Sequence, residues 1–404
     1  MKFLTTVLLL FAFSSINSQN IYLKNIHIFD GNSDNIIENS AIKIKNGSIE
    51  WIGKQLSADP KDYTSIDGLG YYLMPGMIDA HTHISDLKAA ERALNSGVTT
   101  VRSASTSSYQ DVALANLSKT GVIPGPDVIS AGVYVSPNLG ETILADPRLS
   151  VLSNGVRTDD ELRLLVQINA DRGVGVIKTR GTERAGSPET DPRQQTYTTA
   201  QLKVVVDEAA KHNLKVMVHA HGDEGARAAV EAGALSIEHG TYLSYETLTL
   251  MKAKGVYLVP TLITIEDLKI PGGEYSNPTL ELRGRSMMPE AEQAVKNAIA
   301  LGVKIATGAD NDYSAESTTR VSLEAEHFVR LGMTNFQALQ STTKVAAELL
   351  NILDKTGTIE VGKEADLILL PTNPLDNIMA LQDVLMVISN GKVAIKRIPF
   401  HLTD

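Results

Sequence analysis

Two regions of alternating apolar and polar residues flank a middle of different texture. The alternation runs through IYLKNIHIFD, AIKIKNGSIEWIG and TSIDGLGYYLMPG, and returns near the end in GTIEVGKEADLILL and VLMVISNGKVAIKRI. A period of two is typical of strands with one buried face. Asn46-Gly47 and Asn390-Gly391 are dipeptides that favour tight hairpin turns. We therefore expect residues 19–73 and 346–404 to build one small sheet domain from both chain ends.

The middle, residues 74–345, alternates short apolar runs with amphipathic helical runs such as TAQLKVVVDEAAKHN. The strand candidates are LMPGMIDAHTH, TTVRSAS, DVISAG, GVIKTRG, KVMVHAH, LSIEHG, YLVPTLI (starting near Val256) and KIATGAD. Eight strand–helix units predict an α/β fold of the (β/α)8 barrel type, a TIM barrel. A doubly wound open sheet is the alternative, but no glycine-rich phosphate turn follows the first strand.

Residues 1–18 differ from the rest of the chain. Lys2 precedes an apolar run over residues 3–13, and small and polar residues follow. This order is typical of a secretory signal peptide, and the run is short for a membrane span. We expect cleavage near Ser18 or Gln19 and an exported protein, periplasmic or secreted, with no membrane segment afterwards. An uncleaved anchor and a buried first strand are the alternatives.

Composition narrows the chemistry further. The chain has no cysteine, which excludes disulfides, thiolate metal ligands and a cysteine nucleophile. Its formal net charge of −10 argues against a nucleic-acid binder, which needs a basic footprint. Any metal must therefore be held by histidine, carboxylates or a less usual ligand.

Histidines stand where the predicted strands end, and in barrel enzymes the reacting residues project from the carboxyl ends of the strands. His81 and His83 close the first strand candidate, and residues two apart share a face, so both imidazoles can reach one metal. His219 and His239 end the fifth and sixth candidates and would meet at the same rim. His221 lies on the same strand face as His219. Its role is open between a substrate contact, a supporting group behind the ligands and a rival metal ligand.

Lys178 closes the fourth strand candidate after three apolar or small residues. Burial lowers the pKa of an ammonium group, and the neutral amine can add carbon dioxide to give a carbamate whose oxygens could bridge two metals. A snorkelling or salt-bridged lysine is the alternative. Asp310 ends the eighth candidate, where a carboxylate can accept a proton from water and return it to a leaving group. A helix N-cap is its alternative role. Arg180 and Arg184 are candidates for binding a substrate carboxylate, unless they simply face solvent.

Several motifs together resemble the amidohydrolase superfamily over about residues 20–395. They are MPGMIDAHTH, GVTTVR, PGPDVISAG, VIKTRG, VHAHG, SIEHGT, VPTL, ATGAD and GTIEVGKEADLILLPTNPLDNI. The chain is similar to the branch of imidazolonepropionase-like amidohydrolases and carboxylated-lysine Xaa-Pro and Xaa-Arg/Lys dipeptidases. The resemblance implies a barrel accompanied by a small β-sandwich from both chain ends. Two departures concern the substrate: Ser103 replaces an aspartate of many relatives, and residues 136–140 lack their histidine.

The resemblance also implies a site with a pair of zinc ions per chain. His81, His83 and Asp310 would hold the more buried ion, His219 and His239 the second, and carboxylated Lys178 would bridge them.

We expect metal-activated hydroxide to hydrolyse a C–N bond in a small amide or peptide, such as a dipeptide or an N-acyl amino acid. Asp310 would carry the proton, and His221 is the second catalytic candidate. A mononuclear deaminase or cyclic-amide hydrolase of the same barrel is the nearest alternative, and a catalytically silent binding protein a remote one. A homo-oligomer is one of the assemblies that the sequence allows.

Overall fold

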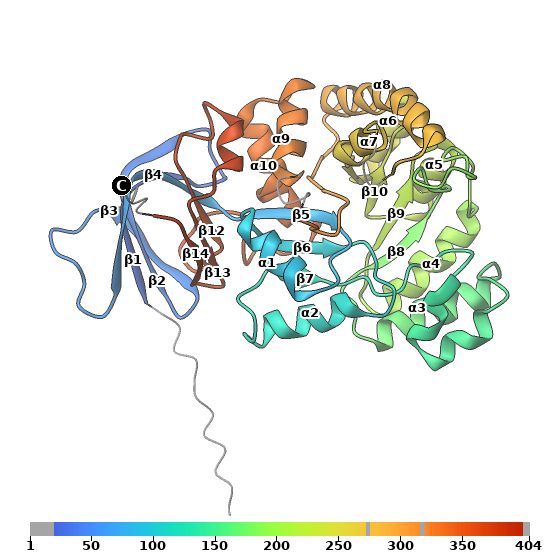
Figure 1. Ribbon diagram of the computed structural model, residues 1–404, viewed down its shortest axis with the longest axis horizontal. Helices are drawn as coiled ribbons and strands as arrows, with labels where there is room; N and C mark the ends of the chain where they lie inside the picture. The colour runs from blue at the N-terminus through green and yellow to red at the C-terminus, as the bar shows by residue number, and fades with distance from the viewer. Residues whose placement is uncertain (1–19, 272–274, 316–319, 399–404) are drawn as a thin grey trace, which may run out of the picture.

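The computed structural model describes residues 20–271, 275–315 and 320–398. The predicted signal segment, residues 1–18, lies outside these ranges. The described chain has an α/β fold, with a seven-stranded sheet at one end of the molecule and two parallel sheets covered by helices beyond it (Figure 1). Among the described residues, no helix combines the length and the apolar character needed to cross a membrane.

Strands from both chain ends share the seven-stranded sheet, as the alternating patterns predict. Their order is β14-β13-β12-β4-β1-β2-β3. The bounds are β1 Ile21–Phe29, β2 Ile36–Lys45, β3 Ser48–Lys54, β4 Thr64–Pro75, β12 Leu367–Leu370, β13 Met386–Ser389 and β14 Lys392–Lys396. The sheet is mixed, because β1 runs parallel to β4 whereas β12 runs antiparallel to it. The sandwich arrangement and the domain boundaries stay predictions.

Two hairpin tips, one from each end of the chain, meet in this sheet. Asn46 and Gly47 join β2 to β3, and Asn390 and Gly391 join β13 to β14; all four have positive φ. The Ala365 amide donates to the Gly47 carbonyl at 2.8 Å, and its carbonyl accepts from the Gly391 amide at 3.1 Å. A Cβ on Gly391 would overlap the backbone of Gly47. Glycine is therefore required at Gly391 for close approach as well as for its turn.

Seven parallel strands form the other two sheets. One contains β5 Met77–Thr82, β6 Val98–Ser103 and β7 Asp127–Ile129; the other contains β8 Ile177–Arg180, β9 Val216–Ala220, β10 Ser236–His239 and β11 Tyr257–Val259. Hydrogen bonds connect the two sheets where β7 leads toward β8: the Val135 amide donates to the Lys178 carbonyl at 2.9 Å. Residues 304–310 connect the opposite edges, because the Leu258 amide donates to the Lys304 carbonyl and the Ala80 amide to that of Thr307.

Three predicted strands are shorter than expected. The third candidate, residues 127–132, is a strand only over Asp127–Ile129. The eighth candidate, residues 304–310, forms an isolated bridge at Ile305 rather than a strand. The Thr307 amide donates to the Ser341 carbonyl, and Asp310 takes a left-handed backbone at φ 48°, so the ladder is not continued. The seventh candidate stops at Val259, because Pro260 has no N–H to donate to a ladder.

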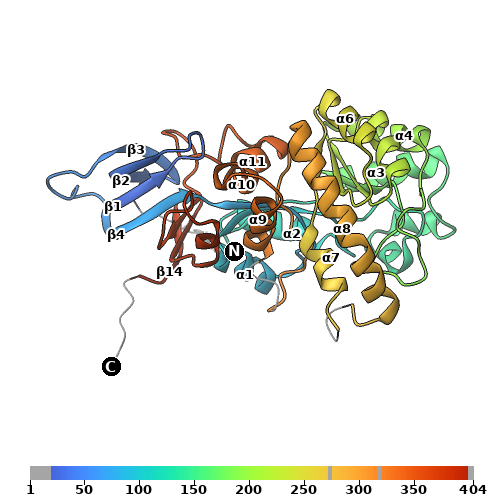
Figure 2. The same cartoon turned by 90° about the horizontal axis from the view of Figure 1, so that it is seen from above.

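The helices gather around the parallel strands (Figure 2). Their bounds are α1 Leu87–Asn95, α2 Gln110–Lys119, α3 Asp159–Asp171, α4 Thr199–Lys211, α5 Asp223–Ala232, α6 Tyr245–Lys254, α7 Leu262–Leu268, α8 Pro278–Leu301, α9 Arg320–Arg330, α10 Asn335–Thr342 and α11 Lys344–Leu349. Thr158 and Thr198 begin α3 and α4 with capping boxes, in which side chain and backbone satisfy each other's donors. Helices packed on the strands leave the strand ends free to carry polar groups.

Candidate metal centre

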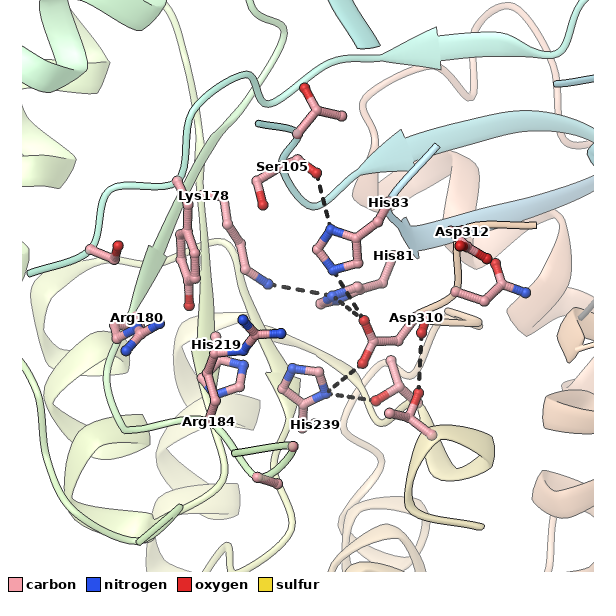
Figure 3. A pocket seen from close by; sticks show the side chains of 18 of the residues that line it. His81, His83, Ser105, Lys178, Arg180, Arg184, His219, His239, Asp310 and Asp312 are labelled. Carbon is pink, nitrogen blue, oxygen red and sulfur yellow. Dashed lines mark hydrogen bonds and ion pairs between the residues drawn. The ribbon is translucent and has the colours of Figure 1, made fainter. Parts of the chain in front are cut away.

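A cavity of about 570 Å³ opens at the carboxyl ends of the parallel strands. Its walls include all seven side chains named from the sequence as candidate metal ligands or catalytic groups: His81, His83, Lys178, His219, His221, His239 and Asp310. Figure 3 shows His81, His83 and Asp310 on one side and Lys178 and His219 on the other. Segments more than two hundred residues apart in the chain thus supply one site.

The first cluster of potential ligands is His81, His83 and Asp310, whose ligand atoms all lie within 4.8 Å of one another. Both Nε2 atoms are 3.3 Å from Oδ1 of Asp310. Burial by itself raises the pKa of this carboxyl, but the surrounding imidazoles of His81, His83 and His239 hold it well below its ordinary range. Asp310 is therefore an anion that can serve as a ligand.

The second cluster is His219, His221 and His239, again within 4.8 Å. The ring of His239 lies 4.5 Å from that of His219 and 4.6 Å from that of His221. Burial lowers the pKa of all three imidazoles, that of His221 to about 3. They are neutral at neutral pH, which is the form that binds a metal. Asp310 connects the clusters, since its Oδ2 is 3.8 Å from Nδ1 of His239.

Lys178 lies between the two clusters. Its Nζ is 3.5 Å from Nε2 of His81 and 5.8 Å from the centre of the Tyr134 ring. Burial lowers the pKa of the Lys178 ammonium to about 8, although Glu238 and Asp310 oppose the shift. About a tenth of the amine is therefore neutral at pH 7, far more than for an ordinary lysine, and the neutral amine is the form that reacts with carbon dioxide.

Backbone carbonyls fix two of the imidazoles. Nδ1 of His83 lies 3.0 Å from the Ser105 carbonyl oxygen, and Nε2 of His219 lies 3.1 Å from that of Glu183. Because a carbonyl oxygen only accepts, these nitrogens carry the hydrogen, and the other nitrogen of each ring keeps its lone pair. In the neutral ring, which is the form that binds a metal, the lone pair of His83 is then on Nε2, 3.3 Å from Oδ1 of Asp310.

A buried ion pair behind the site fixes His81. Nδ1 of His81 lies 2.7 Å from Oε2 of Glu238, and the Arg102 guanidinium donates to Oε1 of Glu238 at 3.0 Å. Arg102 also donates to the Ala80 carbonyl and to Ser236 Oγ. Burial raises the pKa of Glu238, but Arg102 and His81 outweigh it and lower the pKa to about 2. The anion holds the hydrogen on Nδ1 and leaves Nε2 of His81 free for a metal.

A second buried carboxylate, Asp79, supports the turn that carries Asp310. Asp79 Oδ1 accepts from the amides of His81 and Ala309, both at 3.0 Å, and Oδ2 accepts from the Tyr313 hydroxyl at 2.7 Å. These bonds hold both sides of Asp310, whose positive φ is uncommon for a residue other than glycine.

Sequence reasoning missed Asp79, Arg102 and Glu238. The available signal was a charge inside an apolar strand, which is costly unless it is paired.

The donor set suits a divalent metal. It offers neutral imidazoles, one carboxylate and one buried amine, with no thiolate in the chain. Imidazole nitrogen is favoured by borderline ions such as zinc, copper, iron and nickel over magnesium or calcium. The residues therefore fit a catalytic transition-metal site.

Comparison with known proteins gives the family. The sequence model of the amidohydrolase family matches residues 72–394, so the chain belongs to this family. An ochratoxinase of Aspergillus niger is 30% identical over 391 residues, which cover 86% of this chain and 80% of that protein. An imidazolonepropionase of Rhizobium rhizogenes is 26% identical over 377 residues, covering 82% and 86%. The family resemblance found in the sequence is thus confirmed.

A solved structure agrees with these sequence relatives. A Xaa-Pro dipeptidase with bound methionine in its active site has a TM-score of 0.84 and 27% identity, over 93% of this chain and 99% of that one. Together these relatives support metal-dependent hydrolysis of an amide or peptide bond as the activity of this chain.

Proposed function

We propose that this protein is a zinc-dependent hydrolase that cleaves the C–N bond of a small carboxylate-bearing amide, such as a dipeptide or an N-acyl amino acid. One observation carries the proposal: the Asp310 carboxylate lies between two imidazole clusters, with a buried amine beside them. Such a set serves metal-assisted hydrolysis, whereas a binding protein has no need of it.

Zinc would be held in two places. His81, His83 and Asp310 would bind one ion and His219 and His239 the other, with Lys178 between them. When bound, zinc polarises the substrate carbonyl and makes water a nucleophile at neutral pH. His221 completes the second cluster, where it would contact the substrate or support the ligands.

Lys178 would join the two positions as a carbamate. The neutral amine forms an N–C bond with carbon dioxide and releases a proton, leaving two oxygens and a negative charge. The lowered pKa of Lys178 supports this reaction, and the anion formed would balance part of the metal charge.

Asp310 would move the proton. Its ionised carboxylate accepts a proton from the attacking water and passes it to the departing nitrogen, which leaves as an amine. The substrate therefore gains a water molecule across its C–N bond, and the side chain returns to its starting state.

Two arginines favour a substrate with a carboxylate. Arg180 and Arg184 line the cavity on the side of β8, across from Asp310 (Figure 3). Arg180 already pairs with Glu183 at 2.9 Å and lies over the Tyr134 ring. No carboxylate among the described residues forms an ion pair with Arg184, so its guanidinium can bind one from a substrate.

The proposal is tested by a screen of dipeptides and N-acyl amino acids. Hydrolysis should stop after a chelator removes the metal and should return when zinc is added. The active protein should contain about two zinc ions per chain if the site is bridged. Release of ammonia from a purine or pyrimidine, by a protein that contains about one metal ion per chain, would instead identify a deaminase.

The proposal also covers the barrel fold and the export of the protein. We infer that the two parallel sheets and residues 304–310 form one (β/α)8 barrel, which the hydrogen bonds at both sheet edges support. We also propose that residues 1–18 direct export. N-terminal sequencing of the protein made in its own cells would test this, with an end near residue 19 expected.

A further inference from the structure

A long loop connects β8 to α4, and backbone hydrogen bonds hold the two ends of this loop, its base, together. The Glu183 amide donates to the Gln194 carbonyl at 3.0 Å, and the Thr196 amide donates to the Gly181 carbonyl at 2.8 Å. The Glu183 carbonyl is the group that lies against His219 of the metal centre. The base of the loop is therefore fixed independently of its tip.

The tip, residues 184–190, forms part of the wall of the active-site cavity. Arg184, Ala185 and Gly186 line the cavity together with Tyr275. A Cβ on Gly186 would lie 3.0 Å from the Tyr275 ring, so the segments that carry these two residues pass in close contact. Within the tip, Thr190 Oγ1 donates to the Arg184 carbonyl at 2.6 Å. The position of the tip thus sets the position of Arg184.

One arginine of α8 holds this tip from behind. Nη1 of Arg283 donates to the carbonyls of Ala185 and Ser187, at 2.5 and 2.7 Å. Nη2 of the same residue donates to the carbonyls of Pro188 and Thr190, at 3.3 and 2.6 Å. A guanidinium presents its donors in a rigid planar fork, and here both arms are used on backbone carbonyls of a single turn. Arg283 is therefore a built-in template for the conformation of the tip.

We propose that Arg283 is a positioning residue that sets substrate affinity by holding the 184–190 tip, and with it Arg184, against the cavity. This inference rests on the proposed function for the identity of the substrate, a carboxylate-bearing amide. It assigns Arg283 no contact with substrate or metal. Loss of the guanidinium should free the tip while the backbone pairs at Glu183 and Thr196 keep the metal centre intact.

The test compares Arg283→Met with the wild type by hydrogen–deuterium exchange, metal content and kinetics. We expect residues 184–190 to exchange at least about tenfold faster, with unchanged metal content. For an N-acyl amino acid that the wild type hydrolyses, KM should rise about tenfold or more with a smaller change in kcat, since displaced binding groups lose affinity first. The C-terminal carboxamide of the same compound should show little change.

Two further variants make the result specific. Arg285→Met removes a guanidinium from the same helix, one that pairs with Glu281 instead, and should leave exchange and KM as in the wild type. Arg283→Lys keeps the charge but cannot span both pairs of carbonyls, so it should restore only part of the affinity.

Wild-type exchange of the tip in Arg283→Met, or an unchanged KM despite a loosened tip, would overturn the inference. Because exchange and metal content are measured without substrate, failure of the hydrolysis screen would contradict the proposed activity and leave the structural part of the inference standing.

Discussion

Asp310 contacts both imidazole clusters through its two carboxylate oxygens. Its carboxylate can bind metal through one oxygen and exchange a proton through the other, and only the second role needs an acid–base group. Replacing one oxygen by an amide nitrogen separates the two roles, because the remaining oxygen can still coordinate.

We therefore expect Asp310→Asn to keep most of its metal but to lose turnover by about 10²–10⁴-fold. Elemental analysis and kcat measured on the same preparation check this. Asp312→Asn is the matched control, since Asp312 lines the same cavity but is exposed and belongs to neither cluster. A fully active Asp310→Asn enzyme would remove Asp310 from proton transfer.

Glu238 makes no contact with the cavity but fixes the tautomer of His81. Glu238→Gln preserves the shape and removes the charge that holds the hydrogen on Nδ1. We expect metal affinity to fall about 10–100-fold, as is typical when a group behind a metal-binding histidine is changed. Competition with a chelator measures it. Asp366→Asn, an equally buried but remote change, should leave metal affinity unaltered.

The sequence could predict the site residues that end a strand, but not the pairs that only the tertiary fold brings together. His81, His83, His219 and His239 were predictable because each ends an apolar run, and parallel strands end at one rim. The bond between Arg102 and Glu238 joins residues 136 positions apart, from β6 and β10. Nothing local indicates that partnership, because it depends on which strands share the interior.

At the level of elements, the start of α5 touches the end of β8 through two glycines. A Cβ on Gly181 would lie 2.6 Å from the Gly225 carbonyl oxygen, and a Cβ on Gly225 would overlap the Gly181 carbonyl oxygen. The two backbones therefore pack in direct contact beside Arg180. Strand and helix patterns predicted both elements but not this contact. A glycine in a sequence indicates conformational freedom of the backbone, but it does not indicate which segment packs against it.

Gly225→Ala should force α5 away from the end of β8 and cost about 1–3 kcal/mol of stability, the usual range for an overpacked site. Thermal unfolding should show a Tm lower by about 2–6 °C for a chain of this size. Glu224→Ala changes the neighbouring exposed position and should unfold like the wild type. Equal Tm values for all three proteins would show that the helix can move without cost.

For the whole molecule, Asp366 sits where the seven-stranded sheet meets the parallel strands. Its Oδ1 accepts from the Asn390 amide at 2.8 Å, and the Asn390 side chain donates to Asp127 at 3.1 Å. Burial raises the pKa of Asp366 to about 7, and the charges of Asp127 and Glu364 add to the shift. The folded state therefore holds this proton at pH values where the unfolded chain has lost it.

A raised carboxyl pKa means that stability falls as pH rises from about 4 toward 7, because the native state binds the extra proton. Asp366→Asn removes the titrating group and should unfold about 1–3 °C above the wild type at pH 8, with little difference near pH 4. Tm measured across this range checks the sign. Asp376→Asn, at an exposed position, should follow the wild-type curve. If the Tm of the wild type does not fall below that of Asp366→Asn as pH rises, the raised pKa of Asp366 is contradicted.

The placement of β12 beside β4 has a consequence for the order of folding. Nearly three hundred residues separate Pro75 from its partner Leu367, so this edge of β4 stays unpaired until those residues have been made. Non-local pairing of this kind is slow, and an open strand edge invites association with other chains. A product that terminates prematurely before Leu367 would expose this edge permanently and should aggregate. Pairing of β12 with β4 thus closes an edge that every shorter product would leave open.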